Sequence, residues 1–148
     1  MISGKLISLL IAALSGVLMA VQGSLNTSLS KTIGLMEMAF VVNATGAAAL
    51  AATLFLFRMG NGDFGVFSHA PWYSFLGGII GVAIIYLVAA SIPAVGMCNA
   101  TTAIIVGQVL TAILIDHFGA LGLQKYHIGW EQFVGLGLLA VGAKLLMR

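Results

Sequence analysis

The sequence predicts an all-α integral membrane protein: a single membrane domain, residues 1–148, with five transmembrane helices. Hydrophobic residues make up 61% of the chain and charged residues only 7%, whereas soluble globular domains carry about 25% charged residues. Five apolar segments are each long enough to cross about 30 Å of hydrocarbon as a helix. Short connections that contain polar residues, glycine or proline separate these segments. We therefore expect a chain with almost no soluble part.

The first predicted helix covers about residues 6–27. Lys5 followed by an apolar run is also how a signal peptide begins, but this run continues to Val21 without a small-residue cleavage pattern. Four more apolar segments follow, which favours a membrane helix. Polar residues recur on one side of this helix, at Ser8, Ser15, Gln22 and Asn26. This spacing predicts a polar stripe along one helix face.

The second predicted helix covers about residues 36–57. One face carries Asn43 together with the small residues Gly46 and Ala47. Small residues let helix backbones approach closely within a bilayer. We therefore expect this face to pack against another helix, and Arg58 to end the helix at the membrane surface.

The third predicted helix covers about residues 71–92. The connection before it, Met59–Ala70, is polar and glycine-rich, which predicts a surface loop. Pro71 suits the first helical position, and Trp72 and Tyr73 suit the membrane interface. The residues that follow this helix, Pro93–Gly96, form a very short reversal. The third and fourth helices are therefore expected to be antiparallel neighbours.

The fourth predicted helix covers about residues 97–118, and the fifth covers about 128–146. Gln108 lies near the middle of the fourth helix. Asp116 and His117 stand at its end, near the interface. Because histidine titrates near neutrality, one interpretation of these two residues is a proton relay. The favoured interpretation is that they cap the helix, pair with Lys125 or meet water, as charges at the membrane edge do.

Lysine and arginine give no preference for one orientation in the membrane. The six residues divide equally between the two sides: Lys5, Arg58 and Lys125 on one, and Lys31, Lys144 and Arg148 on the other. An excess of these residues normally marks the cytoplasmic side. Equal numbers predict dual topology and a homodimer in which the two copies are antiparallel. The alternative is a fixed orientation imposed by a partner or an insertase.

Five neutral polar side chains within the spans form the predicted substrate site: Gln22, Asn26, Asn43, Thr101 and Gln108. An amide in hydrocarbon is costly unless it is hydrogen-bonded, so these side chains should face other helices or a shared cavity. At a rise of about 1.5 Å per residue, Gln22 and Asn43 both lie about 5–8 Å to the same side of the midplane. An inverted copy would supply the mirror set, which is the arrangement of alternating-access transporters. The alternative is that the amides only hold helices together, at about 0.6–2 kcal/mol each.

The sequence also resembles a known family. The resemblance is carried by Gly16, Gln22, Asn26, Leu29, Gly34, Ala39, Asn43 and Gly46, and by Gly107–Gln108 and Asp116–Gly119. Over essentially its whole length the chain resembles the YdcZ-like branch of the drug/metabolite transporter superfamily. The resemblance implies a bacterial inner-membrane protein of five helices, equivalent to half of a ten-helix transporter built from inverted repeats and completed by dimerisation. It implies small metabolites or drugs as cargo, without naming one.

One departure from the superfamily concerns energy coupling. Small multidrug exporters of the superfamily rely on a glutamate in the first helix, where this chain offers only Gln22 and Asn26. Proton coupling by that route is therefore not expected.

Several classes of protein are excluded by what the sequence lacks. It has no nucleophile–base set, phosphate loop or metal cluster, so we expect neither an enzyme nor a cofactor. The single Cys98 cannot form an intramolecular disulfide. A net charge of +2 without a basic run gives no reason to expect a nucleic-acid partner.

The expected function is that of a multi-pass transporter subunit in the cell inner membrane. It would move a small polar or amphipathic solute by alternating access, with the lipid bilayer and a second copy of the chain as its partners. Two alternatives stay open: a small ion channel lined by amides and hydroxyls, and an accessory membrane subunit of a hetero-oligomer. The substrate, the direction of transport and the coupling ion are not determined by the sequence.

Overall fold

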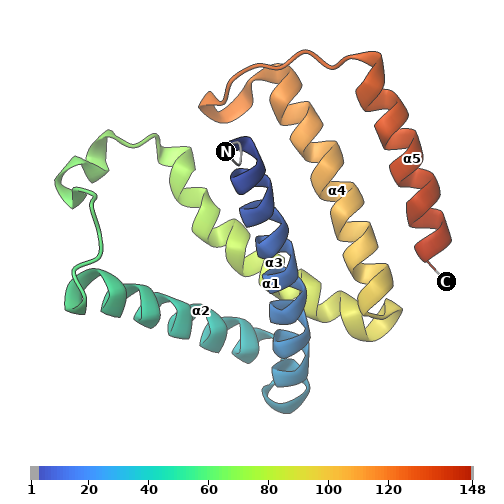
Figure 1. Ribbon diagram of the computed structural model, residues 1–148. Helices are drawn as coiled ribbons and strands as arrows, with labels where there is room; N and C mark the ends of the chain where they lie inside the picture. The colour runs from blue at the N-terminus through green and yellow to red at the C-terminus, as the bar shows by residue number, and fades with distance from the viewer. Residues whose placement is uncertain (1–3, 148) are drawn as a thin grey trace. The chain divides into compact units, whose positions relative to one another are not determined.

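The computed structural model describes residues 4–147, and this range is all-helical, without a strand (Figure 1). Its α-helices are α1 (Gly4–Ile33), α2 (Leu35–Ala51), α3 (Leu76–Val95), α4 (Met97–Phe118) and α5 (Trp130–Leu146). A π-helical turn, Ala52–Leu56, extends α2, and short 3₁₀ turns cover Phe64–His69, Trp72–Phe75 and Ala120–Gly122. Arg148, which was counted in the charge balance, lies outside the described residues.

Within residues 4–147, four helices are long and apolar enough to cross a membrane: Gly4–Ile33, Leu35–Leu56, Trp72–Val95 and Met97–Phe118. The α5 helix has 17 residues, which is about 26 Å against a hydrocarbon core of about 30 Å. The all-helical prediction is thus confirmed, with four helices that are suited to cross a membrane. The fifth crossing stays a prediction.

The first helix is longer than predicted, since α1 continues past residue 27 to Ile33 through a polar stretch. Two hydroxyls near this end donate to carbonyls of the same helix, Thr27 to Gly23 at 2.8 Å and Ser30 to Thr27 at 2.9 Å. This local pairing lets hydroxyl side chains remain inside a helix. Gly34 then interrupts the helix with a φ of 100°, a conformation that suits glycine, and α2 begins at the next residue.

The third helix also runs further than predicted. Pro93 was expected in the turn, but it lies inside α3, which ends at Val95. A proline near the end of a helix removes only one hydrogen bond from the last turn, so the helix continues for two residues. Gly96, with a φ of 84°, separates α3 from α4. The antiparallel pairing of α3 and α4 stays a prediction.

The chain forms two compact units, one up to Pro93 and one from Ala94 onward. In the first unit a small core joins three helices: Met38 and Ala39 of α2 and Ala89 of α3 are buried. Leu29 of α1 packs against this core, as does Ile85 of α3. In the same unit α2 runs away from the end of α1 at a wide angle (Figure 1).

The second unit is an antiparallel hairpin of α4 and α5 (Figure 1). Its buried residues are small, Ala100 and Thr102 near the start of α4 and Ala143 near the end of α5. Small side chains at both positions let the two helices approach closely. The loop between them folds back onto the end of α4, where the backbone N–H of Tyr126 donates to the carbonyl of Asp116 at 2.8 Å.

Large apolar side chains on the spans remain exposed in the described chain. Leu10 and Leu18 of α1 are 60% and 59% exposed, and Leu138 of α5 is 69% exposed. Exposing so many leucines to water would be unfavourable, whereas contact with lipid acyl chains carries no such cost. The surface therefore fits a protein whose solvent is the bilayer.

We expect Ala89→Leu to lower the free energy of unfolding by about 1–3 kcal/mol, because the added atoms overpack a site that is 0% exposed between α2 and α3. Thermal unfolding in detergent measures this. The matched control, Ala83→Leu, adds the same atoms at an exposed position of α3 and should leave the melting temperature unchanged. Equal melting temperatures for the two variants would contradict the core.

Candidate substrate site

Hydroxyl groups within the helices are largely satisfied by their own helix. Ser8 donates to the carbonyl of Gly4 at 3.1 Å, and Ser15 donates to that of Ala12 at 2.7 Å. Hydroxyls elsewhere do the same: Thr45, Thr53, Ser91 and Thr111. In the polar stripe predicted on α1, the amides are therefore the side chains that can bind a partner outside the helix. Amides, unlike these hydroxyls, present two donors and an acceptor that one backbone carbonyl cannot fully satisfy.

Asn26 is the most buried of these amides. It lies on the buried side of α1 with Gly23 and Thr27, and it is only 6% exposed. Its amide makes no hydrogen bond to any residue between 4 and 147, and its polar atoms are not fully enclosed by the described residues. The structure thus retains, at the end of α1 that joins α2, an amide whose donors and acceptor are open to a partner from outside its own fold.

Gln22, one turn before Asn26, is exposed. It sits at the edge of the face that buries Asn26, so both amides can be reached from the same side of α1. Like Asn26, it makes no hydrogen bond within the described residues. The two residues form the α1 part of the predicted site.

Asn43 is half-buried on α2, beyond the core residue Ala39. Its Nδ2 donates to the carbonyl of Ala39, in its own helix, at 2.8 Å. This bond uses one donor and leaves the side-chain oxygen as an acceptor. Among the described residues, Asn43 does not bridge α2 to another helix, so the interhelical role weighed for it is not seen.

Thr101 and Gln108 belong to the second unit, where both lie on α4. A separation of seven residues puts them on one helix face about 10 Å apart. Thr101 is half-buried and Gln108 is exposed. Thr102, the neighbour of Thr101, donates to the carbonyl of Cys98, in the same helix, at 2.8 Å.

The five predicted residues thus fall into two groups. The first unit carries Gln22, Asn26 and Asn43, and the second carries Thr101 and Gln108. In the part of the chain that the structure describes, none of the five donates to or accepts from another helix. The set offers donors and acceptors without a formal charge.

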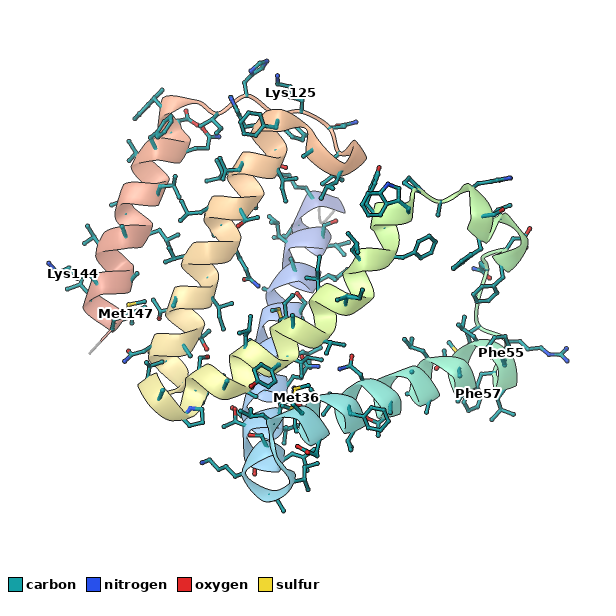
Figure 2. The ribbon with its side chains drawn as sticks, turned by 180° about the vertical axis from the view of Figure 1, so that it is seen from behind. Met36, Phe55, Phe57, Lys125, Lys144 and Met147 are labelled. Carbon is teal, nitrogen blue, oxygen red and sulfur yellow. The ribbon has the colours of Figure 1, made fainter. Side chains whose placement is uncertain are left out.

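Asp116 and His117, at the end of α4, show an unexpected feature. Among residues 4–147 neither forms an ion pair with Lys125, which lies in the loop beyond the helix (Figure 2). The Nδ1 atom of His117 is buried and has no partner in the described residues, while its ring lies edge-on to Phe118 at 5.1 Å. Within residues 4–147 it is the one buried side-chain nitrogen or oxygen without a hydrogen-bond partner.

The structure also contains two cavities that sequence reasoning did not find. One, of about 440 Å³, lies between the start of α4 and the end of α5 and is bordered by Gly96, Asn99 and Leu145. The other, of about 310 Å³, lies beside the π-helical turn, with Phe55 and Asp63 in its wall. Neither contains a predicted site residue, and no repeated sequence pattern marks either one. Across residues 4–147, no three side chains could together hold a metal ion.

Comparison with known proteins gives a match over nearly the whole chain. The family model described as "Putative inner membrane exporter, YdcZ" matches residues 7–145. The chain is 24% identical to the inner membrane protein YdcZ of Escherichia coli (strain K12) over 143 residues, which cover 96% of this chain and 94% of that protein. No solved structure matches.

We expect Asn26→Ala to leave the melting temperature in detergent unchanged or raised. The substitution removes no hydrogen bond within the described residues, and alanine improves helix propensity by about 0.6 kcal/mol. Met38→Ala serves as the matched comparison, since it removes a side chain that is 0% exposed and should cost about 2–5 kcal/mol. A loss as large for Asn26→Ala would mean that Asn26 holds helices together.

Proposed function

Since the chain belongs to the YdcZ family, we propose that two oppositely inserted copies carry a small polar or amphipathic solute across the inner membrane by alternating access. Membership makes the chain a multi-pass inner membrane protein of a transporter family. That agrees with the resemblance seen in the sequence. The solute class, the dimer and the residues that bind are our inferences.

The observation that carries the proposal is the Asn26 amide, which lies on the buried side of α1 and makes no hydrogen bond within the described residues. A solute with its own donors and acceptors would complete the hydrogen bonds that α1 leaves open. Gln22 stands one turn away, and Asn43 offers a free side-chain oxygen. Gln108 and Thr101 are the α4 members of the proposed set. Because all five side chains are neutral, the site suits a polar group better than a full charge.

The antiparallel dimer rests on the charge balance and on the number of spans. With a fifth crossing by α5, the termini lie on opposite sides, and three basic residues fall on each side. Nothing in this count favours one orientation. One copy places most of its amides on one side of the midplane, so an inverted copy supplies the other set. Rocking about the two-fold axis would expose each set in turn.

The five proposed residues give little support for coupling transport to an ion. No carboxylate occurs among the five proposed residues, so facilitated diffusion or exchange fits their chemistry as well as proton coupling does. His117, with its unsatisfied Nδ1, lies outside the proposed site.

Dual topology predicts that a carboxyl-terminal reporter is active on both sides of the membrane. One fusion carries alkaline phosphatase, which is active only outside the cytoplasm. The other carries a fluorescent protein that matures only inside the cytoplasm. Both fusions should be active. Asn61→Lys with Gln124→Lys adds two charges to the side of Lys5 and should silence the fluorescent reporter. Ser28→Lys with Thr32→Lys, at exposed positions of α1, should silence the phosphatase.

The control for this experiment exchanges the amides without charge, as Asn61→Gln with Gln124→Asn. It should keep both reporters active. A wild-type chain that activates one reporter alone has a single orientation, and the antiparallel homodimer would then be abandoned.

Substrate binding should depend on Asn26 and Gln108. A thermal-shift screen of metabolites on the purified protein identifies a ligand, whose affinity we expect to fall about tenfold, or about 1.4 kcal/mol, in Asn26→Ala and in Gln108→Ala. The matched control is Gln124→Ala, which removes an exposed amide from the loop after α4. A variant with unchanged affinity removes its residue from the site.

Reconstituted vesicles separate the carrier from the two alternatives. Saturable flux and counterflow of the identified ligand support alternating access. Single-channel currents would indicate a pore instead. Purified protein that binds the ligand but transports nothing would point to an accessory subunit that needs another chain.

A further inference from the structure

The connection between α2 and α3 differs from the polar surface loop that its composition suggested. We call residues 55–75 the aromatic connection. Its ring side chains are strongly exposed: Phe55 70%, Phe64 67%, Phe67 61% and Trp72 75%. Glycine, asparagine and aspartate do occur between them, but they lie mainly in the stretch 60–65. The exposed surface of the connection is therefore chiefly aromatic.

Local geometry explains why the rings gather. Two 3₁₀ turns, Phe64–His69 and Trp72–Phe75, make up about half of the connection. Because a 3₁₀ turn has three residues per turn, side chains at i and i+3 lie on the same side of it. This spacing places Phe64 and Phe67 on one side of the first turn, and Trp72 and Phe75 on one side of the second. Asp63 holds the first turn by accepting a hydrogen bond from the Gly65 N–H at 2.7 Å.

Ring contacts join these turns to both neighbouring helices. Phe55, in the π-helical turn that extends α2, stacks on Phe64 with ring centroids 6.2 Å apart and planes at 19°. Phe67 meets Phe75, just before α3, at 4.6 Å. Figure 2 shows Phe55 and Phe57 at the far end of α2, where the connection begins. One ring pair therefore begins at the end of α2, and another ends at the start of α3, next to two helices suited to span the membrane.

We propose that the aromatic connection lies in the interfacial layer of the bilayer, with Phe64, Phe67 and Trp72 at the boundary between headgroups and acyl chains. Its two ends leave the spans Leu35–Leu56 and Trp72–Val95, so it begins and finishes at the membrane surface. Aromatic rings concentrate at this depth. Because the connection joins two membrane spans directly, we expect its exposed rings to contact the lipid interface.

The few charged groups of the connection agree with this placement. Arg58 is exposed directly after the π-helical turn, where a guanidinium can reach lipid phosphates while its stem stays in apolar surroundings. Asn61 and Asp63 are exposed in the same stretch. An exposed element that carries both rings and polar groups suits the plane of the interface. It would hold the ends of α2 and α3 at a constant depth.

Spin-label accessibility tests the depth of this surface. In a Cys98→Ser background, single cysteines replace Phe64, Phe67 or Asn61 in the full chain, reconstituted in vesicles of phosphatidylethanolamine and phosphatidylglycerol. Nitroxides at 64 and 67 should collide several-fold more with oxygen than with a water-soluble nickel complex. The label at 61 is the matched control in the same connection and should show the reverse.

Two results would overturn the proposal. Labels at 64 and 67 that meet the nickel complex as readily as the label at 61 would place the rings in water. Labels shielded from both oxygen and nickel would place them against protein, such as a second copy. A measurement free of cysteine substitutions uses Trp130→Phe, which leaves Trp72 as the single tryptophan. Lipids brominated near the headgroup should quench Trp72 more than iodide does, and the opposite order would refute the proposal.

Discussion

Hydrocarbon offers no hydrogen-bond donor or acceptor, and the polar side chains of this protein must satisfy that constraint one by one. Serine and threonine do so locally, because a hydroxyl can donate to a carbonyl three or four residues earlier in its own helix. Ser8, Thr27 and Thr102 all show this bond. Amides have more groups than one carbonyl can serve. Hydroxyls can therefore be satisfied within their own helix, whereas amides need a partner outside it.

Asn26 shows this separation most clearly. It is almost fully buried next to Thr27, which is satisfied, yet its own amide has no partner among residues 4–147. In the proposed site, a passing solute would supply the missing hydrogen bonds and then leave. The neutral character of the set also limits how strongly any one solute is held.

The same apolar environment shapes the parts of the chain outside the proposed site. Packing cores within each unit are small: Met38, Ala39 and Ala89 in one, and Ala100 with Ala143 in the other. Most large apolar side chains are left to lipid or to other helices. The aromatic connection extends this logic to the membrane surface, where rings can meet both acyl chains and headgroups. Aromatic rings would thus position the span ends, whereas hydrogen bonds would bind solute at the proposed amides.

Composition and segment length determined the class of this protein, because an apolar run of about 20 residues has few alternatives to a membrane helix. The amides were identifiable for the same reason, as polar interruptions of those runs, and family membership followed from their pattern. Tertiary structure decided what depends on local hydrogen bonds and on neighbours. It extended α1 to Ile33 through self-bonded hydroxyls, carried α3 past Pro93, and gathered separated rings onto 3₁₀ turns. It alone distinguished Asn43, bonded to its own helix, from Asn26, since sequence shows an amide but not whether a carbonyl lies within its reach.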